Sequence, residues 1–391
     1  MNTRSSATGL LPAVVLLFAF PGAVAGQSTL PTLARLEALR LNAVDGDVPA
    51  RYSRTVSRNV AIALAKRVAD CRGLLGAAAP RPAIVLAILD ETDWPRVTDR
   101  AYGVPHHSTA DSPYVIVMPQ SWRAAPMYAG VRAQLAGALG ADEVDRFVHL
   151  IALHEVGHLL TNAALNTTTQ EIRTRYPLWY GEFTANYFAD ACLAPHSEEG
   201  AFHRRGVAAL AAIPRQRFTT LDDAGRVLIE KDPSGRPYIL TEAGRLNFAR
   251  YQGFTAHMAG RLRDAGVGTA RVVEIVRQQW ARPGRQGTDV LVKDFAVIAP
   301  GWNEWLIEQG AIAGPRIGAG SGGEHGPNWR GRQFGRVPRG TRGGRGQSGR
   351  SRSTGSTRMA RRAGGRQAAR AAAASRLPAA AVEPRSLGET S

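Results

Sequence analysis

The chain has 391 residues, of which 44% are hydrophobic, and its formal net charge at pH 7 is +17. This length is enough for one large domain, or two smaller ones, with a substantial core. Two cysteines are too few for a disulfide scaffold, and beyond the first 20 residues no apolar run is long enough to cross a membrane. The composition therefore excludes small disulfide-rich domains and multi-span membrane proteins.

The first residues have the features of an export signal. Arg4 precedes an apolar run at 10–20, and Ala23-Val24-Ala25 provides a cleavage pattern of small residues. We therefore expect residues 1–25 to be a signal peptide, with the mature protein periplasmic or extracellular and without a transmembrane segment. An uncleaved anchor is the alternative interpretation.

Export would permit a disulfide between the two cysteines, Cys71 and Cys192. Two buried free thiols would account for them equally well. The sequence leaves both possibilities open.

In the first third of the chain, apolar residues from Leu30 to Ala77 recur at helical spacing, with a break between Leu41 and Val60. Ala83–Leu89 and Tyr114–Met118 are short runs rich in β-branched residues, which predicts two strands. The polar stretch His106–Pro113 between them is predicted to be a loop.

Further along, the sequence predicts mostly helix as far as Ile312. The predicted helices include 142–160, 178–193, 245–265 and 269–280. Lys231–Gly235, with the sequence Lys-Asp-Pro-Ser-Gly, is a strong turn signal that interrupts them.

The helix predicted at 142–160 contains the sequence His154-Glu155-Val156-Gly157-His158. Residues four apart project from one face of a helix, so His154 and His158 can bind a single metal ion. Glu155 is placed to reach a water molecule at that ion, and Gly157 leaves room for another element to cross closely. The alternative is a helix with two hydrogen-bonded structural histidines.

A catalytic zinc site needs a third protein ligand. We predict Glu182, 24 residues after His158 on the helix 178–193. Asn186 lies one turn later on the same face, where it could hydrogen-bond a ligand imidazole. Glu171 and Asp190 are the rival candidates for the third ligand.

Together, His154–His158 and Glu182 resemble the gluzincin branch of the zincin metallopeptidases, which includes thermolysin. The resemblance covers roughly Ala83–Leu193. In this family an edge strand antiparallel to the substrate precedes the metal helix, and Ser112–Pro119 is similar in position and composition. Thermolysin-like members have Asp four residues after the third ligand, where this chain has Asn186.

The resemblance implies one zinc ion bound by the two histidines and the distant glutamate, with Glu155 as the general base. It also implies a Tyr or His that stabilises the oxyanion, for which Tyr251 and His257 are the candidates, with Tyr187 behind them. Each of these could equally be an aromatic residue of the core. His149 is interpreted as a structural histidine, and the pair at 106–107 as loop histidines that could line the cleft.

We therefore expect an α+β protein. A zincin-like catalytic domain at 26–195 would combine a small mixed sheet, with an antiparallel edge strand, and the metal-binding helix. A helical lobe at 196–313 and a tail at 314–391 would follow. The expected function is exported, zinc-dependent hydrolysis of peptides. A non-peptidase zinc hydrolase, or a protein that binds polyanions and has only a structural metal site, are the alternatives.

The basic tail supports the last alternative. Residues 314–391 contain 16 arginines, no lysine and three glutamates, so they carry +13, and the preceding 313 residues carry only +4. Gly, Arg and Ser dominate, and apolar contacts are too few to offset the entropy of ordering. We expect a disordered tail that either binds an anionic surface or polymer or is a solvated extension. With only two aromatic residues, Trp329 and Phe334, specific nucleic-acid binding is not expected.

Overall fold

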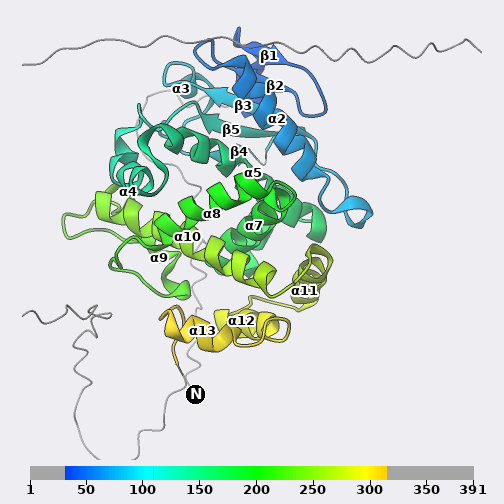
Figure 1. The fold of residues 1–391 in the computed structure, drawn as a ribbon, viewed down its shortest axis with the longest axis vertical. Helices are drawn as coiled ribbons and strands as arrows, with labels where there is room; N and C mark the ends of the chain where they lie inside the picture. Colours follow the sequence, from blue (N-terminus) through cyan, green and yellow to red (C-terminus); the bar gives the residue numbers. More distant parts are fainter. Residues whose placement is uncertain (1–30, 109, 315–391) are drawn as a thin grey trace, which may run out of the picture. The chain divides into compact units, whose positions relative to one another are not determined.

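The computed structural model describes residues 31–108 and 110–314, and it is a mixed α+β fold with one five-stranded sheet and many helices (Figure 1). The expected fold class is thus confirmed at the level of α+β. The predicted signal peptide and arginine-rich tail lie outside the described residues. No helix in the described ranges is both long and apolar enough to span a bilayer.

Two parallel strands, β3 (Ile84–Leu89) and β5 (Tyr114–Pro119), form the centre of the sheet. β2 (Ala50–Tyr52) extends it parallel to β3, and β1 (Asn42–Val44) and β4 (His106–Ser108) close the two edges in antiparallel pairing. The order across the sheet is β1-β2-β3-β5-β4.

The side chains of β3 and β5 are buried on both faces of the sheet. On one face Leu86, Ile88, Ile116 and Met118 join the large core that contains the main helices. On the other, alternate residues pack against α1 (Thr32–Glu37) and α3 (Trp94–Val97) in a second cluster: Val85, Ala87, Leu89, Val115 and Val117. Burial on both faces explains why these strands read as continuous apolar runs rather than alternating ones.

The sheet differs from the sequence expectations in three places. The break between the two helical stretches of residues 30–77 contains β1 and β2, which lie between α1 and α2 (Arg58–Arg72). The expected loop at 106–113 begins with β4. Within Ser112–Pro119, expected at the edge, Tyr114–Pro119 forms the interior strand β5. The strands β1, β2 and β4 have three residues each, too few to show a period-two pattern, and they form by pairing with neighbouring strands.

The helix that carries the histidine motif, α5 (Val144–Leu165), lies between the sheet and a layer formed by α7, α8 and α10 (Figure 1). It ends where Asn166 adopts a left-handed conformation, which suits asparagine. α7 (Leu178–Leu193) has the predicted bounds.

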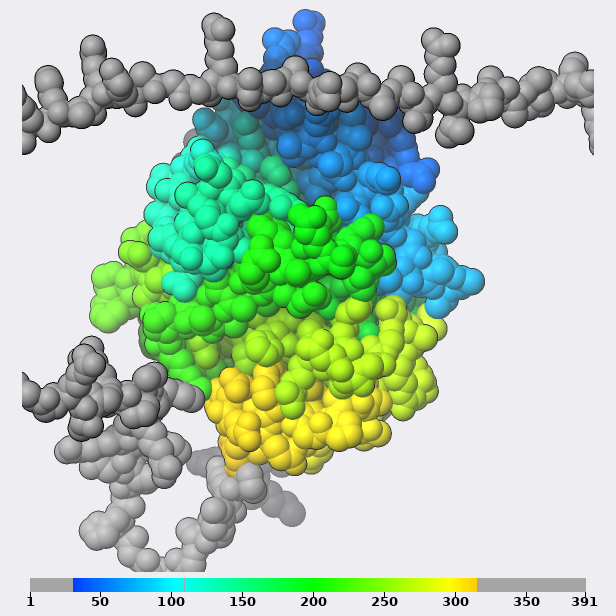
Figure 2. All heavy atoms as spheres, in the orientation of Figure 1, coloured from blue at the N-terminus to red at the C-terminus, as the bar shows by residue number. Residues whose placement is uncertain are grey.

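The other helices of the second half are α6 (Thr169–Arg175), α8 (Ser197–Ala211), α9 (Arg226–Ile229), α10 (Glu242–Asp264), α11 (Thr269–Ala281), α12 (Thr288–Ala296) and α13 (Trp302–Glu308). α10 and α11 agree with prediction to within a few residues. α12 and α13, yellow in the space-filling view, lie against the yellow-green segments of α10 and α11 (Figure 2). Before the motif helix, α4 (Ala129–Leu139) packs on α8.

A disulfide joins Cys71 near the end of α2 to Cys192 near the end of α7, which decides between the two possibilities left open by the sequence. The cysteines are 121 residues apart. In the chain-entropy model, closing a loop of this length stabilises the folded state by roughly 5 kcal/mol. The bond therefore fixes α7 against the N-terminal half of the fold.

α5 and α7 cross at a position where only glycine fits. A Cβ atom built on Gly157 would overlap the carbonyl oxygen of Ala185 and lie 2.8 Å from its Cα. Both atoms belong to the backbone of α7, so they cannot move aside as a side chain could. Gly157 therefore sets the separation of the two helices that carry the site described below.

We predict that Gly157→Ala destabilises the protein by about 1–3 kcal/mol, because one added methyl group overpacks this crossing. Gly260→Ala is the matched control, since nothing lies within 4 Å of its Cβ position in the helix α10. Alanine there should be neutral or stabilising by up to about 1 kcal/mol. Urea unfolding of both variants measures the difference, and equal stabilities would contradict the close crossing.

Candidate metal centre

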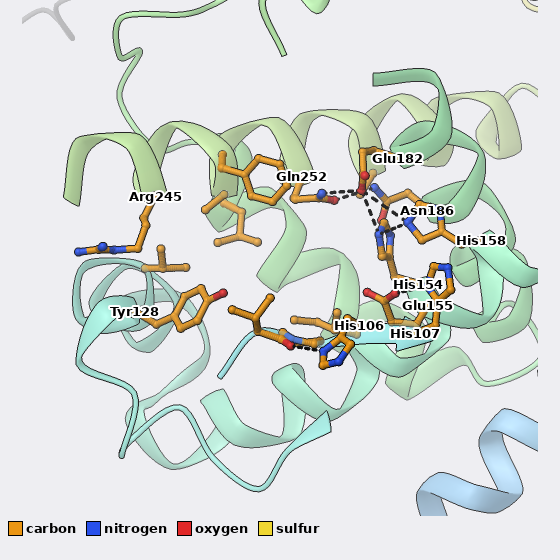
Figure 3. A pocket seen from close by; sticks show the side chains of 18 of the residues that line it. His106, His107, Tyr128, His154, Glu155, His158, Glu182, Asn186, Arg245 and Gln252 are labelled. Carbon is orange, nitrogen blue, oxygen red and sulfur yellow. Dashed lines mark hydrogen bonds and ion pairs between the residues drawn. The ribbon is translucent and has the colours of Figure 1, made fainter. Parts of the chain in front are cut away.

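Three side chains converge where α5 faces α7. The Nε2 atoms of His154 and His158 are 3.1 Å apart, and Oε2 of Glu182 lies 3.1 Å from the first and 3.7 Å from the second. All three side chains are buried, and Figure 3 shows them directed toward one point. This group could hold a metal ion. The structure thus brings together the three ligands predicted from the sequence.

The surrounding hydrogen bonds fix which nitrogen of His154 is free. Its Nδ1 donates to Oδ1 of Asn186 over 2.9 Å, and Asn186 in turn donates from Nδ2 to Thr255 over 2.9 Å. With the proton on Nδ1, the Nε2 lone pair points at His158 and Glu182. Asn186 therefore has the orienting position predicted for it.

The donor set fits a small divalent cation. Zn–N distances of about 2.0–2.1 Å at tetrahedral angles place ligand atoms about 3.3 Å apart, close to the separations observed here. Two imidazole nitrogens and one carboxylate oxygen are a ligand set typical of catalytic zinc, in which a fourth position stays open. The residues present therefore fit zinc.

The ionisation of the group also suits a cation. Burial lowers the pKa of His158 to about 3. Burial also opposes charge on His154 and Glu182, but their mutual hydrogen bond and attraction outweigh it, so the pKa of His154 is raised and that of Glu182 is lowered. His154 and Glu182 thus stabilise each other's charged forms. Metal ligands must be deprotonated, so binding of an ion would displace any proton held on these two groups.

Glu182 has a further hydrogen-bond partner. Gln252 of α10 donates from Nε2 to Oε2 of Glu182 over 2.6 Å. The sequence predicted this helix, but the functional residues proposed on it were Tyr251 and His257. Adjacent residues point about 100° apart on a helix, so it is Gln252 that reaches the site.

Glu155 is held by a chain of hydrogen bonds. Nδ1 of His107 lies 2.7 Å from Oε2 of Glu155, and Nε2 of His107 lies 3.3 Å from Oγ1 of Thr169. Asn162 donates to that same hydroxyl over 2.8 Å. A hydroxyl that accepts from Asn162 is free to donate to Nε2, which leaves the His107 proton on Nδ1, directed at Glu155.

This contact keeps Glu155 ionised. Burial alone would raise its pKa, but the hydrogen bond from His107 holds it well below the usual carboxyl range. The sequence suggested only that the histidines at 106 and 107 could line the cleft. Both do line the cavity beside the ligands, and His106 is held there by Thr98 and the Val104 carbonyl. The pairing with Glu155 depends on strand β4, which the sequence did not reveal.

A cavity of about 240 Å³ opens beside the three ligands. Its walls are mostly apolar and come from both sides of the predicted boundary at 195/196; they include Trp122, Met127, Val131, Ile151, Leu210 and Phe248. His203 of α8 also lines it, with burial lowering its pKa to about 4 and its Nδ1 without a hydrogen-bond partner. The candidate metal ligands therefore lie at the wall of an apolar cavity.

The two residues proposed as oxyanion stabilisers lie elsewhere. The Tyr251 hydroxyl donates to the Thr220 carbonyl over 2.5 Å, and the His257 ring stacks on Trp305. Tyr187 likewise donates to the Val267 carbonyl. Neither Tyr251 nor His257 lines the cavity. Their positions do not support the role that the resemblance implied.

The rival ligands have other partners. Glu171 forms the capping box of α6 with Thr168, and Asp190 pairs with Arg263 at 2.6 Å. His149 contacts the Gln120 carbonyl, in keeping with the structural role predicted for it.

Comparison of the chain with protein-family models, with curated proteins and with solved structures finds no match. The function of the protein is therefore inferred from its sequence motif and the geometry of the site.

We predict that Glu182→Gln and His158→Ala greatly reduce zinc affinity while the fold survives. Asn186→Ala should be milder, with a loss of about 10- to 100-fold, because it removes only an orienting partner. Glu171→Gln is the control, since glutamine can still cap α6 and the residue lies away from the site. Chelator competition measures affinity, and circular dichroism checks folding. Metal loss in Glu171→Gln with retention in Glu182→Gln would contradict the assignment.

Proposed function

We propose that this protein is an exported zinc metallopeptidase whose metal is bound by His154, His158 and Glu182. One observation carries the proposal: three buried lone-pair donors converge beside a fourth residue, Glu155, that is ionised and directed to the same cavity. Histidines that only stabilise a helix do not need a buried carboxylate near the Nε2 atoms of both rings. Glu182 is such a carboxylate for His154 and His158.

A zinc ion bound there would supply a Lewis acid that polarises a carbonyl and acidifies water. Glu155 is the general base that takes a proton from the attacking water and later delivers it to the leaving amine. His107 holds the Glu155 carboxylate in place through a 2.7 Å hydrogen bond. The apolar cavity walls exclude bulk water, which strengthens each of these interactions.

The sheet edge favours a peptide as substrate. β4 carries His107 and pairs only with β5 within the described sheet, so its outer edge has free backbone groups beside the site. An extended peptide can add to such an edge through main-chain hydrogen bonds. The resemblance to gluzincins implies the same mode of binding, although here the edge strand is β4 and not Ser112–Pro119.

Export is proposed from the N-terminal sequence and is supported by the disulfide. Cys71 and Cys192 form a buried bond between two helices, and structural disulfides persist mainly in oxidising compartments.

The direct test is hydrolysis of an unstructured protein by the purified mature chain, with and without 1,10-phenanthroline. We expect cleavage that the chelator abolishes and added zinc restores. Cleavage that is insensitive to the chelator, or zinc-loaded protein that cleaves no peptide bond, would contradict a metallopeptidase.

We predict that Glu155→Gln retains zinc but loses about 10²- to 10⁴-fold in turnover, because a carboxamide cannot accept the proton of water. Metal content and kcat are measured on the same preparation. Turnover near that of the wild type would exclude Glu155 as the general base.

His107 should act by positioning Glu155. We expect His107→Leu to lower kcat by about 10- to 100-fold, the range for a lost hydrogen bond to a charged group, with zinc content unchanged. His107→Asn can present an amide donor close to the Nδ1 position, so it should recover part of the loss. The control is His149→Asn, since the ring of His149 bonds to the Gln120 carbonyl and does not line the cavity. Equal activity in the Leu and Asn variants would show that His107 does not act through this hydrogen bond.

A further inference from the structure

Apolar side chains from several helices form most of the cavity wall beside the metal ligands. Val131 comes from α4, Ile151 from α5, Leu210 from α8 and Ala249 from α10. Walls of this kind favour an apolar occupant over water. The cavity volume of about 240 Å³ exceeds the roughly 150 Å³ of an engineered protein cavity that binds benzene. An aromatic side chain of a substrate therefore fits.

The Tyr128 hydroxyl enters this apolar space from the side opposite the metal ligands. Figure 3 shows it directed across the cavity toward them, and within the described part of the chain it forms no hydrogen bond. Arg245 lies on the same side, but its guanidinium donates to the Leu240 carbonyl and is directed away from this hydroxyl (Figure 3). The Tyr128 hydroxyl is therefore available to an occupant of the cavity.

The Tyr128 side chain is held in a fixed position. Its ring stacks on Trp122, with centroids 4.3 Å apart and the two planes 2° from parallel. A Cβ atom on Gly103 would lie only 3.1 Å from the Tyr128 ring, so the backbone there covers the ring closely. Burial raises the pKa of Tyr128, so the hydroxyl keeps its proton and can donate as well as accept a hydrogen bond.

The walls and the hydroxyl together define the side chain that fits. The walls need a large apolar body, and the hydroxyl needs a polar partner, because a polar group that loses water without a partner is costly. An ionised tip is disfavoured, since the apolar walls would remove its water of hydration. Tyrosine combines an apolar ring with a neutral hydroxyl at its far end. Phenylalanine has the ring without the tip.

From this arrangement we propose that the cavity is the specificity pocket for a tyrosine side chain next to the scissile bond. The substrate ring would lie against the apolar walls, and its phenolic hydroxyl would form a hydrogen bond with the Tyr128 hydroxyl. This inference rests on the proposed function and names its substrate class: peptides cleaved beside tyrosine, with phenylalanine as the nearest substitute.

The test uses peptides of the form acetyl-Ala-Ala-X-Ala-Ala-amide, in which X is Tyr, Phe, Ala, Lys or Glu. We expect cleavage beside X, with kcat/KM about 10- to 100-fold higher for Phe than for Ala, because the ring buries apolar surface. Tyr should exceed Phe by about 2- to 10-fold, the effect of one neutral hydrogen bond. Lys and Glu should be cleaved more slowly than Phe. A rate for Phe, Lys or Glu that equals or exceeds the rate for Tyr would overturn the inference.

Two variants test the pocket through rate ratios, which a partial loss of folded protein does not alter. Tyr128→Phe removes only the hydroxyl, so the Tyr-to-Phe ratio should fall to about one. Val131→Phe fills part of the cavity and should reduce the Phe-to-Ala ratio toward one. The control is Tyr251→Phe, whose lost hydroxyl donates to the Thr220 carbonyl and does not line the cavity. It should keep both ratios. A Tyr-to-Phe ratio that survives in Tyr128→Phe would overturn the inference.

Binding separates this inference from the proposed function. The Tyr, Phe and Ala peptides are titrated by calorimetry into Glu155→Gln protein, with and without the added Tyr128→Phe substitution. Binding in the order Tyr, Phe, Ala that loses its first step in Tyr128→Phe, together with no cleavage by the wild type, would support the pocket and refute the peptidase. Cleavage at rates independent of X, with equal binding of the three peptides, would refute the pocket and leave the peptidase intact.

Discussion

The close crossing of α5 and α7 is the constraint on which the candidate site depends. Gly157 lies between the two histidines, and the backbone of α7 at Ala185 occupies the space of its missing side chain. Because the helix backbones nearly touch, side chains on either side of the contact meet across it. His154 can thus reach Glu182 and Asn186 at about hydrogen-bond distance. The same glycine that breaks the apolar pattern of the motif helix makes the ligand set possible.

The site concentrates buried charge that the fold must offset. Glu155 and Glu182 are both buried and ionised; His107 holds Glu155, and His154 and the Gln252 amide hold Glu182. Burying a carboxylate costs several kcal/mol unless it is paired and hydrogen-bonded. The disulfide Cys71–Cys192 and the large apolar core stabilise the position of α7 against the rest of the fold, which helps to offset this free-energy cost. A divalent cation would offset the remaining buried negative charge, because Glu182 and two neutral imidazoles would then face a positive ion.

The sequence predicted the parts of the fold that depend on long, regular patterns. α7 was predicted with its observed bounds, and α5, α10 and α11 within a few residues, because their apolar faces repeat over several turns. The strands β1, β2 and β4 were missed, since three residues carry no period and pair only in the folded chain. The order of β4 and β5 was missed for the same reason.

In the site, too, the sequence predicted what regular helices position and missed what tertiary pairing positions. His154, His158, Glu182 and Asn186 converge as predicted, because helical spacing alone places each pair on one face. Contacts made by β4, and by the cavity face of α10, required the tertiary structure. Tyr251 was chosen for its chemical type, but its neighbour Gln252 has the direction that reaches Glu182.

The central claim, that two histidines and a glutamate bind zinc, is tested most directly by X-ray absorption at the zinc edge. On the purified mature protein the account predicts one zinc per chain with two imidazole nitrogens at about 2.0–2.1 Å. Oxygen ligands at about 2.0–2.2 Å should complete the shell, and one of them should be lost or changed in Glu182→Gln. A shell with sulfur at about 2.3 Å, a third imidazole, or a spectrum unaltered by Glu182→Gln would contradict it.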